Sequence, residues 1–280
     1  DQTQFHLSPE AFQVIQYQQK NITIYRGGTQ NKQKLLFVHG FNYFVKMYAT
    51  VINELIQHFD VLSLDLPGHG ASDAFDKYDM DLMMNCIHFV CQQQNFSDFV
   101  VAGHSMGGMI AVVMLQSDQF KSMNISRCVA YAPSGVGLKF TLGQIALMNQ
   151  YFKKLPIDFL FKLSMDDNYK RGIKNFNQYK QIMSQIFDDE VTDKEKYVKR
   201  QNQMVSSIPW SDLKEEFKKA DSKLLKIIVQ TTDNYVDGPK LLHFVQDNLK
   251  MASLVIEEGI HEKCIFKPKW ACGHVRQMFE

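Results

Sequence analysis

The chain has 280 residues, of which 45% are hydrophobic and 22% charged, as in a globular protein that buries a sizeable core. This composition excludes disorder, collagen and coiled coil as descriptions of the whole chain. Lysine and arginine total 31 against 30 aspartates and glutamates, so the formal net charge is +1. Because no excess of positive charge is present, we expect no nucleic-acid partner and no attraction to anionic membranes.

The cysteines and the N-terminal residues bear on the compartment. Five cysteines without CxxC spacing occur in the chain: Cys86, Cys91, Cys128, Cys264 and Cys272. An odd number without paired spacing argues against a disulfide framework and a zinc ribbon. The first residues show no basic region followed by an apolar run, so no signal peptide is expected there. We therefore expect an intracellular, reducing compartment, with cytoplasm and mitochondrion both left open, and no metal site.

Short apolar runs alternate with amphipathic stretches along the chain. The predicted strands, in chain order, cover residues 21–25, 35–38, 61–64, 99–102, 127–132, 224–229 and 252–256. The predicted helices cover residues 47–58, 83–90, 106–116, 239–249 and 268–279. Apolar strands that alternate with helices are typical of a parallel sheet with helices on both faces. We therefore expect an α/β fold with a mostly parallel, doubly wound sheet, in which 21–25 is an edge hairpin strand.

The alternation stops between residues 137 and 207, where helical spacing continues and no strand is predicted. We expect 137–207 to be an inserted helical unit, and residues 1–136 and 208–280 to form the α/β core. Most apolar side chains of the insertion are expected to pack it onto the sheet, and a few, Phe140 and Met148 among them, to line a substrate pocket.

One uncharged stretch, residues 99–117, is long enough to cross a bilayer. Gly103, Ser105 and Gly107 interrupt its middle, which favours a strand, a sharp turn and a helix. No transmembrane segment is therefore expected.

The segment Gly103-His104-Ser105-Met106-Gly107 fits the pattern G-x-S-x-G between a predicted strand and a predicted helix. A tight turn there makes the serine hydroxyl project above the sheet, and a side chain at Gly103 or Gly107 would collide with the neighbouring strand and helix. The first N–H groups of the helix would then face the negative oxygen that develops during attack on a carbonyl. The pattern predicts Ser105 as a nucleophile; the alternative is a glycine-rich turn with an incidental serine.

Three segments resemble the α/β-hydrolase family, and the resemblance spans nearly the whole chain. Residues 103–108 resemble its nucleophile elbow, 36–41 its oxyanion strand and loop, and 64–73 its DxPGxGxSD turn. The insertion at 137–207 lies where that family places its cap domain. The resemblance implies an α/β-hydrolase fold with a helical cap, no cofactor, and a catalytic triad in the order serine, acid, histidine.

The family order implies an acid after the strand at 224–229. Asp233 fits that place, and Asp237 ranks second because it resembles a helix cap before Gly238-Pro239. The backbone N–H groups of Met106 and Phe41 are the expected oxyanion donors. His39 and His104 flank these segments and are expected to support the loops by hydrogen bonds.

Two histidines compete for the role of base. His261 follows the last predicted strand, and Pro268 then begins the last helix, although Ile260 stands where the family usually has glycine. His274 has the literal Gly-His pair, but as the base it would leave no room for a last helix. We expect His261, with His274 as the alternative.

The sequence thus predicts a serine hydrolase that cleaves an ester-like bond of a small, largely apolar acyl substrate through an acyl-enzyme. Carboxylic ester hydrolysis is the first expectation; thioesterase, peptidase, acyltransferase and C–C hydrolase activities remain open. A serine at position 105 argues against dehalogenase and epoxide hydrolase chemistry, because those branches of the family place aspartate at the elbow. The rival hypothesis is a non-catalytic protein of the same fold, acting as a ligand receptor or as a subunit of a larger assembly. Neither the substrate nor any protein partner is predicted.

Overall fold

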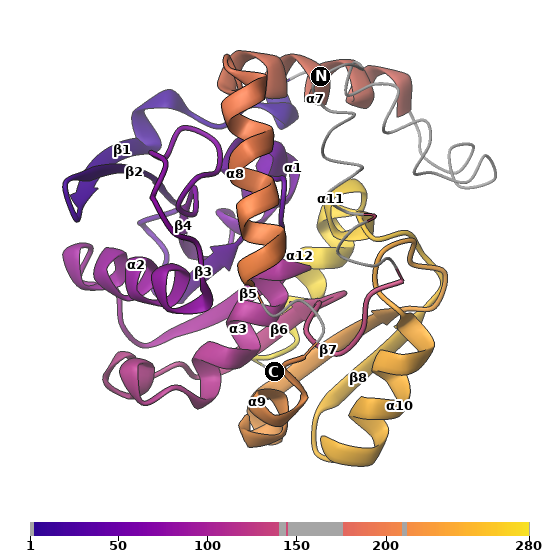
Figure 1. Cartoon of the computed structure of the whole chain (residues 1–280). Helices are drawn as coiled ribbons and strands as arrows, with labels where there is room; N and C mark the ends of the chain where they lie inside the picture. The colour runs from indigo at the N-terminus through magenta and orange to yellow at the C-terminus, as the bar shows by residue number, and fades with distance from the viewer. Residues whose placement is uncertain (1–2, 140–143, 145–175, 209–211, 280) are drawn as a thin grey trace.

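The computed structural model describes residues 3–139, 144, 176–208 and 212–279 (Figure 1). Its centre is a sheet with the strand order β1-β2-β4-β3-β5-β6-β7-β8. Strands β3 to β8 run parallel, and β2 is antiparallel to both of its neighbours. This mostly parallel sheet confirms the predicted fold class. The strand bounds are β1 (Phe12–Tyr17), β2 (Lys20–Gly27), β3 (Lys34–Val38), β4 (Asp60–Leu64), β5 (Phe99–His104), β6 (Arg127–Tyr131), β7 (Leu225–Gln230) and β8 (Ser253–Glu257).

Helices connect the parallel strands. The α-helices described are α1 (Ala49–Leu55), α2 (Met80–Gln93), α3 (Met106–Gln116), α7 (Phe176–Glu190), α8 (Lys194–Ser207), α9 (Lys214–Lys219), α10 (Gly238–Asn248), α11 (Lys263–Phe266) and α12 (Pro268–Arg276). Short 3-10 helices are η1 (Thr3–Phe5), η2 (Pro9–Ala11), η3 (Val45–Tyr48), η4 (Asp118–Met123) and η5 (Ser222–Leu224). The predicted helix over 47–58 is therefore divided between η3 and α1.

Both faces of the sheet are buried, which explains why its strands are continuous apolar runs. Leu36 and Val38 of β3 belong to a core shared with α2, α3, α9 and α10. Leu35 and Phe37 of the same strand face the opposite core, which includes α1, α11 and α12. Successive side chains of one strand point to opposite faces, so a strand covered on both sides needs apolar residues at every position.

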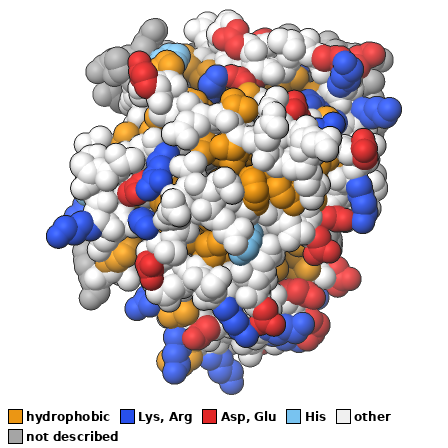
Figure 2. Space-filling view, turned by 90° about the vertical axis from the view of Figure 1, so that its left-hand side faces the viewer, with side chains coloured by type: hydrophobic (Ala, Val, Ile, Leu, Met, Phe, Trp, Pro, Cys, Tyr) orange, Lys and Arg blue, Asp and Glu red, His pale blue; other side chains and the backbone are white. Residues whose placement is uncertain are grey.

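Strand β1 was not predicted. It lies at the edge of the sheet, where it pairs with β2, and three of its six residues are exposed, including Val14 at 64%. An edge strand that is exposed at half of its positions lacks the apolar run by which the other strands are predicted. The predicted strand 21–25 lies within β2, one position in from the edge. Figure 2 shows the side of the molecule on which β1, β2 and α2 lie, where charges of both signs are interspersed.

The uncharged stretch 99–117 divides into β5 and α3, as predicted. None of the helices that the structure describes is long and apolar enough to cross a membrane.

Helices α7 and α8 lie within the predicted insertion (Figure 1), and α8 contacts loops at the carboxyl ends of two strands. The hydroxyl of Tyr197 on α8 donates to the carbonyl oxygen of Asn42 beyond β3 at 3.3 Å, and Gln201 Nε2 to the carbonyl of Gly68 beyond β4 at 3.5 Å. Between residues 140 and 163 the structure describes residue 144 alone, so Phe140 and Met148 of the predicted helical unit lie outside the described residues. The division into a core and a cap therefore stays a prediction.

Candidate active site

Ser105 stands on a strained turn between β5 and α3. Its backbone angles are φ 56° and ψ −116°, a left-handed region that a residue with a side chain adopts at a cost of about 1–3 kcal/mol. Neighbouring elements hold this conformation: the Ser105 N–H donates to the carbonyl of Tyr131 at 2.9 Å, and the Ser105 carbonyl accepts from the Met109 N–H at 2.9 Å. The half-buried serine is thus presented at the carboxyl end of β5 by the backbone itself.

The glycines on either side of Ser105 fill positions where no side chain fits. A Cβ at Gly103 would lie 2.2 Å from the carbonyl oxygen of Gly107, and a Cβ at Gly107 would lie 2.1 Å from that of Val38. Both contacts are with backbone atoms, which cannot move aside cheaply. The collision with strand and helix that the motif predicts is therefore present in the structure, and it lets α3 start directly against β3.

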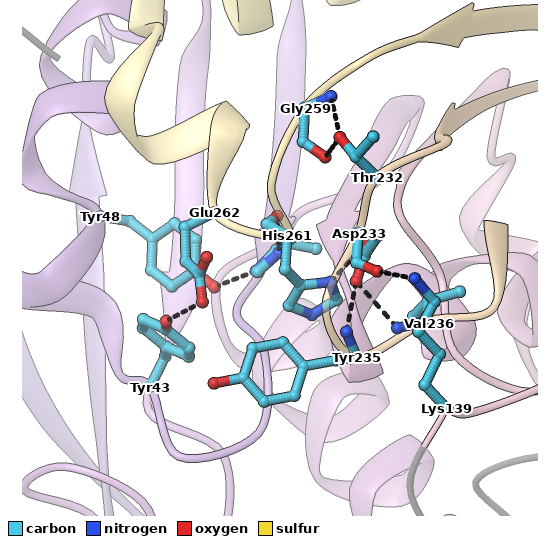
Figure 3. A network of polar contacts seen from close by, with 11 residues as sticks. Tyr43, Tyr48, Lys139, Thr232, Asp233, Tyr235, Val236, Gly259, His261 and Glu262 are labelled. Atoms are coloured by element: carbon cyan, nitrogen blue, oxygen red, sulfur yellow. Dashed lines mark hydrogen bonds and ion pairs between the residues drawn. The ribbon is translucent and has the colours of Figure 1, made fainter. Parts of the chain in front are cut away.

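Asp233 and His261 form a buried pair beyond β7 and β8 (Figure 3). Asp233 Oδ2 lies 2.7 Å from His261 Nδ1, and the two residues are 1% and 4% exposed. The other carboxylate oxygen, Oδ1, accepts from the N–H groups of Tyr235 and Val236 at 2.7 and 2.8 Å. Because a carboxylate only accepts, Nδ1 must carry the proton, which leaves Nε2 of the neutral imidazole as the free acceptor.

A second buried carboxylate, Glu262, follows the histidine directly. It is 4% exposed and accepts a hydrogen bond from the Tyr43 hydroxyl at 3.1 Å. Burial raises the pKa of Glu262 above its usual range. Burial lowers the pKa of His261, but the charge and hydrogen bond of Asp233, together with the charge of Glu262, outweigh this and raise it above its usual value. The site therefore stabilises the protonated form of His261 more than water does.

Asp237 and His274, the second choices for the acid and the base, have other roles in the structure. Asp237 caps α10, where its carboxylate accepts from the N–H of Lys240 at 3.1 Å, as its sequence context predicts. His274 lies in the last turn of α12, and its ring packs edge-on against Trp270 at 4.7 Å between centroids. The structure thus brings His261 to Asp233 and places His274 on a helix that packs elsewhere.

The expected oxyanion donors lie on the two elements that meet at Ser105. Met106 is the first residue of α3, and its N–H precedes the first hydrogen bond of the helix, from Met109 to Ser105. Phe41 lies in the loop of residues 39–44 that follows β3, here called the β3 loop; its ring contacts His69 edge-on at 6.2 Å.

His39 ties the β3 loop to the turn beyond β4. Its Nε2 accepts from the N–H of Leu66 at 2.9 Å, so its Nδ1 is the protonated nitrogen and donates to the carbonyl of Gly40 at 2.8 Å. Burial lowers the pKa of His39 to about 4, which keeps the ring neutral. This is the loop-supporting role expected from the sequence.

A three-residue group of metal-ligand types also occurs among the described residues. Glu54, His58 and Cys272 have ligand atoms within 4.8 Å of one another, on or next to α1 and on α12. None of the three belongs to the site around Ser105, and nothing in the arrangement there calls for a metal.

A mostly parallel sheet that presents a strained serine between a strand and a helix defines the α/β-hydrolase class of fold. The sequence matches the alpha/beta hydrolase family over residues 35–274, and the chain belongs to this family. A solved structure, the enol-lactonase from Burkholderia xenovorans LB400, is similar over 95% of this chain and 99% of its own, with a TM-score of 0.76 and 16% identity. At that identity the likeness shows the fold alone.

Two curated relatives match over shorter segments. The chain is 33% identical to epoxide hydrolase 4 of Mus musculus over 87 residues, which are 30% of this chain and 24% of that protein. It is 27% identical to the monoacylglycerol lipase ABHD6 of Homo sapiens over 135 residues, 47% of this chain and 37% of that protein. The matched part is thus well under half of either relative's length.

Proposed function

We propose that the protein is a serine hydrolase that cleaves an ester-like bond of a small, largely apolar acyl substrate. The observation that carries the proposal is the buried hydrogen bond between His261 and Asp233 in a chain that also presents Ser105 on a strained turn. A serine needs a base to become a nucleophile, and the base needs an acid that holds its tautomer.

The proposed reaction begins when Ser105 Oγ attacks the substrate carbonyl carbon and His261 Nε2 takes the hydroxyl proton. The N–H groups of Met106 and Phe41 donate to the oxygen that becomes negative. The tetrahedral intermediate collapses, the bond to the leaving group breaks, and His261 returns the proton to that group. Water, deprotonated by His261, then attacks the acyl-enzyme and releases the acid and the free serine. Asp233 stays ionised throughout and stabilises the imidazolium.

The choice of ester over epoxide rests on the nucleophile. One relative is named an epoxide hydrolase and another a monoacylglycerol lipase. The sequence resemblance implies aspartate at the elbow of epoxide hydrolases, whereas this chain has Ser105. An apolar acyl group suits a chain whose segment 137–207 carries apolar residues such as Phe140 and Met148 and whose helix α8 contacts the loops beyond β3 and β4. We propose that this segment is a cap over the site.

The test is covalent labelling with a fluorophosphonate, which reacts with an activated serine and not with an idle one. We expect one label per chain, located at Ser105 by peptide mass spectrometry, and none in Ser105→Ala, whose melting temperature should stay close to that of the unmodified protein. Ser63→Ala is the matched control, because Ser63 is a buried serine of β4 bonded to the carbonyl of Phe37; it should label normally. A folded protein that takes no label at neutral or mildly alkaline pH would instead support the non-catalytic alternative.

A further inference from the structure

One tyrosine hydroxyl connects the β3 loop to the residue before Ser105. Tyr48 Oη lies 3.0 Å from the backbone nitrogen of Gly40 and 2.6 Å from His104 Nδ1. The other ring nitrogen, His104 Nε2, lies 2.8 Å from the carbonyl oxygen of His261. Tyr48 and His104 are both fully buried, so these contacts are shielded from water. Three segments that are distant in the sequence therefore meet through two side chains.

The direction of every hydrogen bond in this chain of contacts is determined. The Gly40 N–H can only donate, so the Tyr48 oxygen accepts from it, and the hydroxyl proton stays available for His104 Nδ1. The His261 carbonyl can only accept, so His104 Nε2 must carry the proton. In the neutral ring Nδ1 is then the acceptor, and it takes the hydroxyl proton of Tyr48. Burial, together with the neighbouring His261 and His39, holds the pKa of His104 well below its usual range, consistent with that neutral form.

The two ends of this chain of contacts are both next to proposed catalytic groups. Gly40 immediately precedes Phe41, and the His261 carbonyl belongs to the residue whose ring contacts Asp233. Tyr43 packs against both connecting rings, at 5.6 Å from Tyr48 and 6.0 Å from His104 between centroids. A shift of either loop would break a buried hydrogen bond with no water at hand to replace it.

We propose that Tyr48 and His104 are positioning residues that hold the Phe41 amide and the His261 ring at fixed places relative to Ser105. The inference rests on the proposed function. His104 occupies the variable second place of the G-x-S-x-G motif. The proposal gives it a definite role, because its ring holds the backbone of His261, the proposed base. A displacement of about 1 Å at a catalytic group can lower the rate about 100-fold, so loss of this anchor should be visible in turnover.

The experiment compares Tyr48→Phe with Tyr78→Phe. Tyr78 is a matched control because its buried hydroxyl also accepts a backbone N–H, that of Phe75 at 2.9 Å, in a turn outside the site. Both variants lose one buried hydroxyl and leave one N–H unpaired, and Tyr48→Phe also leaves His104 Nδ1 without its donor, so its melting temperature should fall at least as far as that of Tyr78→Phe. For hydrolysis of a p-nitrophenyl acyl ester, Tyr48→Phe should lower kcat by about 10- to 100-fold with KM changed less than about twofold, while Tyr78→Phe keeps the original kcat.

A second readout does not depend on activity. The proton shared by His261 Nδ1 and Asp233 should give a downfield proton NMR signal in the unmodified protein, in Ser105→Ala and in Tyr78→Phe. We expect this signal to shift or broaden in Tyr48→Phe and in His104→Leu, which removes both ring hydrogen bonds at nearly the same volume.

Folded Tyr48→Phe and His104→Leu proteins with an unchanged signal and unchanged kcat would overturn the proposal. Equal losses of kcat in Tyr48→Phe and Tyr78→Phe would also overturn it, because they would show a general effect of stability. If Ser105→Ala kept full activity, the proposed function would fail, and the NMR comparison would still decide whether the two residues position His261.

Discussion

The two halves of the candidate site are held in place by different forces. Around Ser105 the constraint is excluded volume, because a Cβ at Gly103 or Gly107 would overlap backbone atoms. The loop of residues 258–262 beyond β8, here called the β8 loop, is held instead by hydrogen bonds of His261, which donates from Nδ1 to Asp233 and accepts at its carbonyl oxygen from His104. Substitutions in the first half should therefore appear as a loss of folding, and substitutions in the second half as a loss of activity in a folded protein.

The largest effect is expected from substitution of His261, the central residue of the second half. His261→Ala removes the proposed base, so kcat/KM for a p-nitrophenyl acyl ester should fall by about 1,000-fold or more. His274→Ala is the matched change on α12, where the ring packs against Trp270, and it should keep kcat/KM within about threefold. The reverse pattern, with activity lost only in His274→Ala, would move the base to α12.

Glycine substitutions test the steric half. Gly107→Ala places a Cβ 2.1 Å from the carbonyl oxygen of Val38, so the free energy of unfolding should fall by about 3 kcal/mol or more. Gly273→Ala is the control, since a Cβ there meets nothing within 4 Å and the residue lies inside α12. It should raise the free energy of unfolding by about 0.5–1 kcal/mol. Urea unfolding followed by circular dichroism measures both, and a Gly107→Ala protein of unchanged stability would contradict the steric account.

The pH dependence of turnover tests the charges around His261. The titratable groups around its ring include Asp233, Glu262, His104 and Tyr235, and the two carboxylates raise the pKa of His261 above 6.5 against the effect of burial. A base must be neutral to accept a proton, so kcat/KM should fall as the pH drops through a midpoint above 6.5. A midpoint below 6.5 in the kcat/KM profile would show that desolvation outweighs the carboxylates.

The smallest effect is expected from the second carboxylate. Glu262→Gln keeps the shape of the side chain and removes a negative charge that raises the pKa of His261, so the acid limb of kcat/KM should move to lower pH. At a pH well above the midpoint of that limb, kcat should change only a few-fold. Glu258→Gln, an exposed acid of the same β8 loop, should leave the limb in place. Identical pH profiles for Glu262→Gln and the unmodified protein would remove Glu262 from this account.

The two halves also differ in how much the sequence reveals. The elbow is contiguous, so Gly103, Ser105 and Gly107 predict its geometry from local sterics alone. The triad order implied by the family resemblance led to Asp233 and His261 as the residues that follow β7 and β8, with Asp237 and His274 as the alternatives. The supporting hydrogen bonds could not be predicted, because Tyr48 and His104 are 56 positions apart and His104 and His261 are 157 apart. Only the packed fold brings such partners together.

Glu262 illustrates the same limit. Charged residues are almost never fully buried, so a glutamate beside a predicted histidine is expected to be solvated. Its burial depends on Tyr43, which arrives from the β3 loop. Edge strand β1 was missed for a related reason. Its side chains show no apolar run that predicts a strand, and its strand conformation is held by backbone pairing with β2.

The glycine contacts around Ser105 bear on how such a protein can change during evolution. The turn is enforced by backbone atoms of Gly103, Gly107 and Val38, and the side chain at position 105 takes no part in that constraint. The identity of the nucleophile is therefore separable from the scaffold that presents it. A single codon change at position 105 can install a thiol or a carboxylate at the same spot, so a lineage can explore new reactions without first rebuilding its fold.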